Sequence, residues 1–181
     1  MKEINRKWLV ITVLILVAFV WFTYLLNIRV QMMLYPRKYA EYVEKYAAEF
    51  SVPEYIVYSV VKVESDFDSF AQSEKGACGL MQLMPKTYEW LAELLDEAPK
   101  DIFDAEENIK YGTYYLGMLY ERYNDWTIAL CAYNAGMGNV DKWLEADEFV
   151  ISFSETQFYV NKLEVVMGKY KSLYYGKGVK I

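Results

Sequence analysis

Residues 51–85 read SVPEYIVYSVVKVESDFDSFAQSEKGACGLMQLMP and divide into an apolar first part and a polar, glycine-containing second part. Ser51 and Glu54 have the spacing of a capping box, and Pro53 occupies a first-turn position. The pattern predicts a helix that runs to Glu64 or to the residue before it, followed by a long loop.

Glu64 falls on the apolar face of this helix. Val57, Val60, Val61 and Glu64 follow the spacing i, i+3, i+4 and i+7, so the carboxyl shares a stripe with three valines. Partial burial raises the pKa of a carboxyl, and a protonated Glu near neutral pH can act as a general acid. The alternative is a Glu at a frayed helix end that turns into solvent.

Residues 65–85 form a long connection for a small domain. Gly76 and Gly79 lie among Ser, Gln and Met, so the backbone can approach a ligand closely. Pro85 is suited to begin the next helix. An ordinary helix connection is the alternative interpretation.

A second polar motif, AYNAG, covers residues 132–136 at the end of an apolar helix. Tyr133 and Asn134 would present a phenol and an amide at the helix terminus. Asn followed by Gly is also a common helix stop, so this motif alone has little specificity.

The chain lacks any alternating strand pattern of useful length, which predicts an all-α fold. Capping residues, among them Asp104 and Asp125, and apolar periodicity place the helices. We expect them at residues 35–50, 51–64, 85–95, 104–123, 125–134 and 139–144, with a last one opened by a capping box at Ser154 and Gln157.

The N-terminal segment contains 21 uncharged residues, 8–28, which make about 31 Å of helix against a hydrocarbon core of ~30 Å. This predicts a single transmembrane anchor, since the segment is longer than a signal-peptide core and has no small-residue cleavage site. Basic residues flank it on both sides, so charge specifies the orientation weakly. The expected organisation is 1–29 cytoplasmic tip and anchor, 30–50 connecting helix, and 51–181 catalytic domain.

Composition excludes several kinds of site. With no histidine there is no Ser-His-Asp or Cys-His arrangement, and with only two cysteines a structural zinc site is not expected. Of 19 basic and 25 acidic residues, four basic and one acidic precede residue 30, so the rest carries a formal charge of −9. That balance argues against nucleic acid as a partner. Cys78 and Cys131 form either a disulfide or two buried thiols.

Taken together, these motifs resemble the catalytic domain of soluble-lytic-transglycosylase-type peptidoglycan lyases over about residues 40–175. The resemblance rests on Glu64-Ser65-x-Phe67, Ala71-x-Ser73, Gly76-Ala77-x-Gly79-Leu80-Met81-Gln82-Leu83-Met84-Pro85, Ala132-Tyr133-Asn134-Ala135-Gly136 and Glu155-Thr156-x-x-Tyr159-Val160. It implies a lysozyme-like α-helical fold. It also implies that Glu64 is the sole catalytic carboxyl, without metal or cofactor.

The activity implied is non-hydrolytic cleavage of the β-1,4 bond between N-acetylmuramic acid and N-acetylglucosamine, which leaves a 1,6-anhydro end. By the same resemblance, Ser73, Gln82, Met84, Tyr133 and Asn134 would line the sugar cleft, and Glu155 and Tyr159 would close its far side. Met81 and Leu83 are expected in the core, since alternate residues of an extended segment point in opposite directions.

Peptidoglycan lies outside the cytoplasmic membrane, so the resemblance implies a cytoplasmic N-terminus and a domain that faces the cell wall. We expect a monomer whose partners are glycan strands and, through residues 8–28, the lipid bilayer. Two other functions fit the same motifs. One is a hydrolytic muramidase of the goose-lysozyme kind, and the other is a non-catalytic, membrane-anchored peptidoglycan-binding scaffold.

Overall fold

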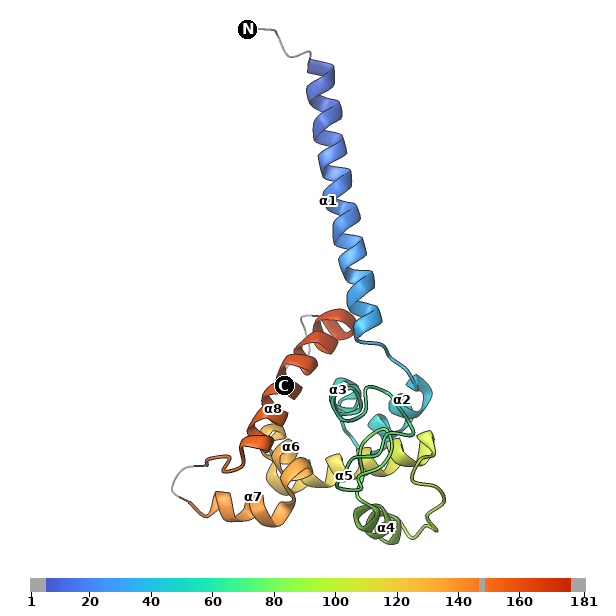
Figure 1. Ribbon diagram of the computed structural model, residues 1–181, viewed down its shortest axis with the longest axis vertical. Coiled ribbons are helices and arrows are strands. Elements are labelled where there is room, and N and C mark those ends of the chain that lie inside the picture. The colour runs from blue at the N-terminus through green and yellow to red at the C-terminus, as the bar shows by residue number, and fades with distance from the viewer. Residues whose placement is uncertain (1–5, 147–148, 177–181) are drawn as a thin grey trace. The chain divides into compact units, whose positions relative to one another are not determined.

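The computed structural model describes residues 6–146 and 149–176 and divides the chain into two units, Met1–Pro36 and Arg37–Ile181. The first unit is one helix, α1 (Arg6–Leu34), with no buried residue (Figure 1). An 18-residue window of α1 has a mean hydropathy of 2.7, so this helix is long and apolar enough to cross a membrane.

The second unit is helical, as the sequence predicted. Over the described residues no strand forms, and only isolated antiparallel bridges join Gln72 to Cys78 and Cys78 to Leu83. Helix α3 packs against α8, and α5 packs against α2 and α6. The helices are α2 (Ala40–Glu49), α3 (Glu54–Glu64), α4 (Pro85–Leu94), α5 (Ala105–Tyr123), α6 (Trp126–Ala135), α7 (Met137–Leu144), α8 (Ser154–Tyr170) and the π-helical η1 (Lys171–Tyr175).

Two of the predicted caps are confirmed and two are wrong. Asp104 accepts a hydrogen bond from the Glu107 amide, and Asp125 accepts one from the Ile128 amide, each at 3.0 Å. Ser51 instead takes a left-handed conformation with φ 56°, and its side chain caps nothing. Ser154 is the first residue of α8 rather than its cap.

The helix expected over residues 35–50 is shorter than predicted. Tyr39 has φ 59°, a left-handed conformation that no helix continues through, so α2 begins at Ala40. Val43, Tyr46 and Ala47 of α2 are buried in the second unit, which begins at Arg37, whereas the sequence placed residues 30–50 in a connecting segment.

Helix α3 lies in the core of this unit. Its residues from Tyr55 to Val61 are all buried, and Tyr58 stacks on Tyr170 of α8 at 5.5 Å between ring centroids. A helix that is buried on all sides has a fixed position, so its last residue, Glu64, is held by the core.

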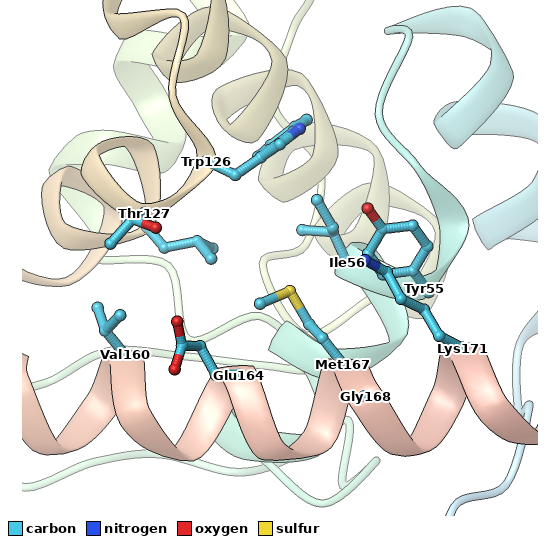
Figure 2. Close-up of a pocket in the computed structure, with 10 residues that line it drawn as sticks. Tyr55, Ile56, Trp126, Thr127, Val160, Glu164, Met167, Gly168 and Lys171 are labelled. Carbon is cyan, nitrogen blue, oxygen red and sulfur yellow. The ribbon is translucent and has the colours of Figure 1, made fainter. Parts of the chain in front are cut away.

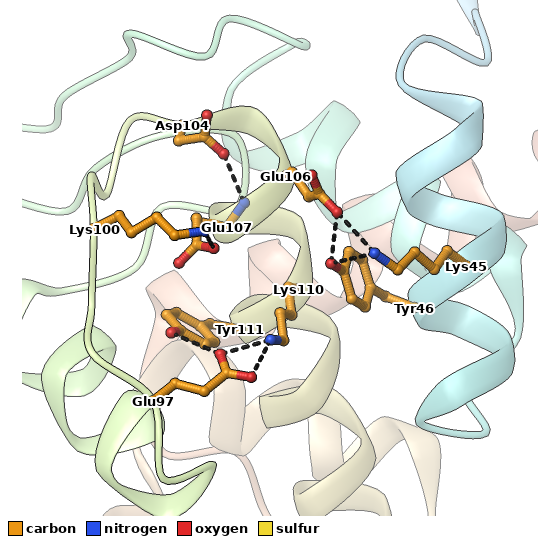
Figure 3. A network of polar contacts seen from close by, with 9 residues as sticks. All are labelled: Lys45, Tyr46, Glu97, Lys100, Asp104, Glu106, Glu107, Lys110 and Tyr111. Atoms are coloured by element: carbon orange, nitrogen blue, oxygen red, sulfur yellow. Dashed lines mark hydrogen bonds and ion pairs between the residues drawn. The ribbon is translucent and has the colours of Figure 1, made fainter.

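A polar network fixes the start of α5 (Figure 3). Glu106 accepts hydrogen bonds from Lys45 and Tyr46 of α2, each at 2.8 Å. Glu107 accepts one from Lys100 at 3.0 Å, so the preceding loop is tied to the same turn. These contacts position Asn108, which holds the loop after Glu64.

Candidate active site

The chain turns back immediately after Glu64. The Ser65 hydroxyl lies 3.1 Å from the Val61 carbonyl and 2.8 Å from the Leu80 carbonyl, so this side chain joins the end of α3 to the glycine-containing part of the loop. The carboxyl-bearing helix end and residues 79–81 therefore form one local structure.

The Asn108 side chain of α5 holds residues 78–81 of the loop through hydrogen bonds to the backbone. Its Oδ1 accepts from the Met81 amide at 2.7 Å, and its Nδ2 donates to the carbonyls of Cys78 at 3.1 Å and Ile102 at 2.8 Å. Gly79 has φ +76°, and a Cβ there would lie 2.3 Å from Asn108 Nδ2. Only glycine fits at this position.

Residues 81–84 alternate as predicted. Met81 and Leu83 are buried in the core, whereas Met84 is 44% exposed and Gln82 is partly exposed. Gln82 has φ 49°, and its Nε2 donates to the carbonyls of Ala71 at 3.1 Å and Gly79 at 2.9 Å. The Gln82 amide therefore supports the loop as well as facing outward.

A cleft of ≈ 260 Å³ brings together four of the residues singled out from the sequence: Gln82, Met84, Tyr133 and Asn134. They come from the loop before α4 and from the end of α6. Leu83, which the sequence placed in the core, is buried but also lines this cleft. The sequence did not identify Thr87 and Tyr115, which line it too; the Tyr115 ring lies 5.4 Å from that of Tyr133.

Glu64 has an unusual electrostatic environment. Burial raises the pKa of its carboxyl to about 7, against smaller lowering effects from Tyr159 and Lys162. Burial, and then the charge of Glu64, raises the pKa of Tyr133 and of Tyr159 well above the ordinary value. Near neutral pH the carboxyl is thus divided between its acid and base forms, and both phenols are protonated.

The two phenols are arranged differently around this carboxyl. The Tyr133 hydroxyl donates to the Met81 carbonyl at 2.8 Å, so it supports the loop beside Glu64. The buried Tyr159 hydroxyl lies close enough to affect the pKa of Glu64 but forms no hydrogen bond of ordinary geometry. Tyr159 belongs to the surroundings of Glu64 and does not line the cleft.

Glu64 itself and two further candidates, Ser73 and Glu155, also lie outside the cleft lining. The Ser73 hydroxyl accepts from the Ala77 amide at 3.0 Å within its own turn. Glu155 is exposed and pairs with Lys75 at 2.9 Å, which connects the loop to the first turn of α8. The next residue, the buried Thr156, donates to Asn134 Oδ1 at 2.8 Å and so orients the cleft amide.

No carboxylate of the described residues contributes to the pKa of Glu64. Asp66 pairs with Lys62 and is 74% exposed, and the exposed Asp68 accepts from the Phe70 amide at 2.9 Å. In residues 6–146 and 149–176, no group of three or more acidic or cysteine side chains could hold a metal ion. In the described part of the chain the site therefore offers one carboxyl whose charge acts on two tyrosines.

Cys78 and Cys131 are free, buried thiols, so of the two arrangements left open by the sequence the structure has the unbridged one. Burial raises the pKa of both thiols, to about 11 for Cys131. Thiolate chemistry at neutral pH is thereby disfavoured.

Comparison with known proteins agrees with this geometry. Residues 41–152 match the Transglycosylase SLT domain family. The soluble lytic murein transglycosylase of Escherichia coli K12 is 32% identical over 143 residues, which cover 71% of this chain and 22% of that protein. Membrane-bound lytic murein transglycosylase F of Desulfosudis oleivorans is 37% identical over 105 residues, which cover 54% of this chain and 22% of that protein.

Solved structures give the same result for the fold. The 70 kDa soluble lytic transglycosylase of E. coli superposes with a TM-score of 0.73 at 28% identity, over 78% of this chain and 25% of that one. The 70 kDa enzyme in complex with bulgecin A matches with a TM-score of 0.73 at 30% identity, over 83% and 26%. The present chain spans about a quarter of the length of these relatives.

The fold and the motifs around Glu64 together define the class: this chain belongs to the transglycosylase SLT domain family. Its all-α second unit has the lysozyme-like fold of that family, as the sequence predicted.

Proposed function

We propose that this protein is a membrane-anchored lytic murein transglycosylase with Glu64 as its catalytic acid and base. The observation that carries the proposal is the Glu64 carboxyl, whose pKa is raised to about 7 at the end of a buried helix. A carboxyl with that pKa can donate a proton in one step and accept one in the next.

The reaction we infer needs only this one carboxyl. Protonated Glu64 donates its proton to the glycosidic oxygen as the bond from the muramyl C1 to that oxygen breaks. The resulting carboxylate accepts the proton of the muramyl 6-hydroxyl as its oxygen bonds to C1. No water is consumed, and the glutamic acid is regenerated.

Two observations support a mechanism that depends on this one carboxyl. Glycoside hydrolases ordinarily use a second carboxylate at a set separation, and Asp66 and Asp68 are solvent-exposed and have other contacts. A Glu-to-Gln mutant of the lytic transglycosylase Slt of Pseudomonas aeruginosa, 25% identical with a TM-score of 0.72, is described as inactive. A single glutamate is thus indispensable in that related enzyme.

We place the glycan in the cleft formed by Gln82, Met84, Tyr133 and Asn134. Met84 offers an exposed apolar surface for a sugar face, and Asn134 offers an amide that Thr156 orients. Tyr159 acts on the Glu64 carboxyl, and Ser73 and Glu155 contact the substrate only where it extends beyond the cleft.

We further propose that α1 anchors the protein in the cytoplasmic membrane, with its N-terminus inside and the second unit facing the cell wall. The uncharged stretch 8–28 matches the thickness of the hydrocarbon core. Curated relatives that include membrane-bound lytic murein transglycosylases C and F support this location.

The full chain in detergent, mixed with purified peptidoglycan, tests whether the protein is an enzyme. We expect the suspension to clear and soluble glycan fragments to appear. Sedimentation of the protein with undigested peptidoglycan would instead favour the non-catalytic scaffold.

The rate of cleavage should depend on pH through Glu64. Proton donation requires the protonated carboxyl, whose share falls about tenfold for each pH unit above its pKa of about 7. Initial rates measured between about pH 5 and about pH 9 should therefore decrease on the alkaline side. A rate that still rises above pH 7 would exclude Glu64 as the acid.

Tyr133→Phe should lower kcat/KM by about tenfold while the protein stays folded. The change removes the hydroxyl that donates to the Met81 carbonyl and loosens the loop beside Glu64. Tyr123→Phe is the matched control, since its hydroxyl bonds Asp141 at 2.9 Å and lies outside the cleft lining. Equal activity of the two variants would remove Tyr133 from the mechanism.

A further inference from the structure

A second pocket, of ≈ 310 Å³, lies between the starts of α3 and α6 and the second half of α8 (Figure 2). Its walls are mainly apolar, from Ile56, Trp126, Leu130, Val160 and Met167, and it shares no lining residue with the cleft at Tyr133. Its volume is that of a small ligand pocket, enough for one or two large apolar side chains.

Two opposite charges flank this pocket on α8 and η1. Glu164 and Lys171 both line it, with Met167 between them in Figure 2, and their backbones lie about 10 Å apart along the helix axis. In the described part of the chain neither has an ion-pair partner. The Lys171 ammonium lies 4.3 Å from the centre of the Tyr55 ring.

Gly168 lines the pocket between these two charged residues and contributes no side chain to its rim. It is exposed within α8, and no atom of the described residues lies within 4 Å of the position that a Cβ would occupy. Glycine in a helix interior is less favourable than alanine, and here the packing does not require it. Its absent side chain lets another backbone approach α8 closely.

We infer that this pocket docks a helical segment of a partner protein. That segment carries a large apolar side chain, which fills the pocket over Gly168. On the same face it carries a basic residue that meets Glu164 and, seven positions away, an acidic residue that meets Lys171. This is the helix-in-groove mode of recognition, with the apolar anchor three or four positions from each charge.

The two charges favour this occupant over the others that an apolar pocket admits. An acyl chain with an anionic head would satisfy Lys171 but would place the Glu164 carboxylate against hydrocarbon. In a two-fold dimer of this chain, the same concave face of each copy would meet the other. Neither copy would then offer a side chain that fills the other's pocket. A polypeptide segment can satisfy both charges and the apolar walls together.

Photocross-linking of the full chain in the membranes of its native cells tests this inference. The reporter is p-benzoylphenylalanine in place of the exposed Thr127 at the pocket rim, and the control reporter replaces the exposed Lys142 of α7. The cross-linked segment is sequenced by mass spectrometry. Two further variants carry the rim reporter: Gly168→Leu fills the rim, and the exchange Glu164→Lys with Lys171→Glu reverses both charges without changing the net charge.

We expect a polypeptide segment with the stated apolar and charged pattern, cross-linked from Thr127 and not from Lys142. The yield should fall at least about tenfold in the charge exchange and in Gly168→Leu, with unchanged circular dichroism and unchanged peptidoglycan cleavage. A lipid adduct, a self-adduct, a segment without the pattern, or no adduct above the Lys142 control would each overturn the inference.

Discussion

Replacement of Glu64 by Gln is expected to reduce peptidoglycan cleavage by about a thousandfold or more, because the amide keeps the shape of the side chain but has no acidic proton to transfer. The release of soluble muropeptides by purified wild-type and variant protein measures this effect. Asp66→Asn is the matched control, since Asp66 is exposed and pairs with Lys62. A Glu64→Gln variant with more than a few per cent of wild-type activity would contradict the assignment.

The same variant should be at least as stable as the wild type. Because the folded-state pKa of Glu64 is raised from 4.5 to about 7, the native state binds more protons than the unfolded state between these values. The free energy of unfolding therefore falls as pH rises from about 4.5 to about 7, by about 1–3 kcal/mol from this group. Glu64→Gln should remove that decrease, which urea unfolding at several pH values can measure.

Asn108→Ala is expected to lower the free energy of unfolding by about 3 kcal/mol and to abolish most activity. The change leaves the buried Met81 amide and the Ile102 carbonyl without their partner, and each unsatisfied group costs about 1–3 kcal/mol, whereas the Cys78 carbonyl keeps its bond from the Leu83 amide at 3.0 Å. Denaturant midpoints and cleavage rates measure both effects. Asn161→Ala, at an exposed position of α8, should change stability by less than about 0.5 kcal/mol.

If Asn108→Ala retained wild-type stability, the loop from Cys78 to Met81 would have to be held by other contacts. If it were destabilised but fully active at low temperature, Asn108 would matter for folding alone. The account predicts loss of both stability and activity. The loop that Asn108 holds is joined through the Ser65 hydroxyl to the end of α3, which carries Glu64.

The sequence pattern predicted a helix start correctly where one capping side chain binds a backbone amide of the first turn. The side chains of Asp104 and Asp125 are each long enough for the carboxylate to reach the backbone amide three residues later, and both caps form. The box at Ser51 failed because that residue takes a left-handed conformation at the end of α2, where the Val52 amide donates to the Ala47 carbonyl at 2.9 Å. Tyr39 also takes a left-handed conformation, so α2 begins at Ala40.

The sequence could predict the residue that we propose carries the chemistry, but not the residues that support it. Helical periodicity placed Glu64 on the apolar stripe of its helix, and the structure gives its carboxyl a raised pKa. Asn108 and Thr156 reach the site from distant helices, and a buried amide or hydroxyl has no local sequence pattern. Ser73 and Glu155 were placed at the cleft from motif order alone, and their contacts lie beside it.

The measurement that tests the central claim most directly is the mass of the muropeptides released from purified peptidoglycan by the full chain. A single-carboxyl mechanism in which the muramyl 6-hydroxyl attacks C1 predicts 1,6-anhydromuramyl ends, absent from digests with Glu64→Gln. Reducing ends, heavier by one water, would contradict the account and identify a hydrolytic muramidase instead.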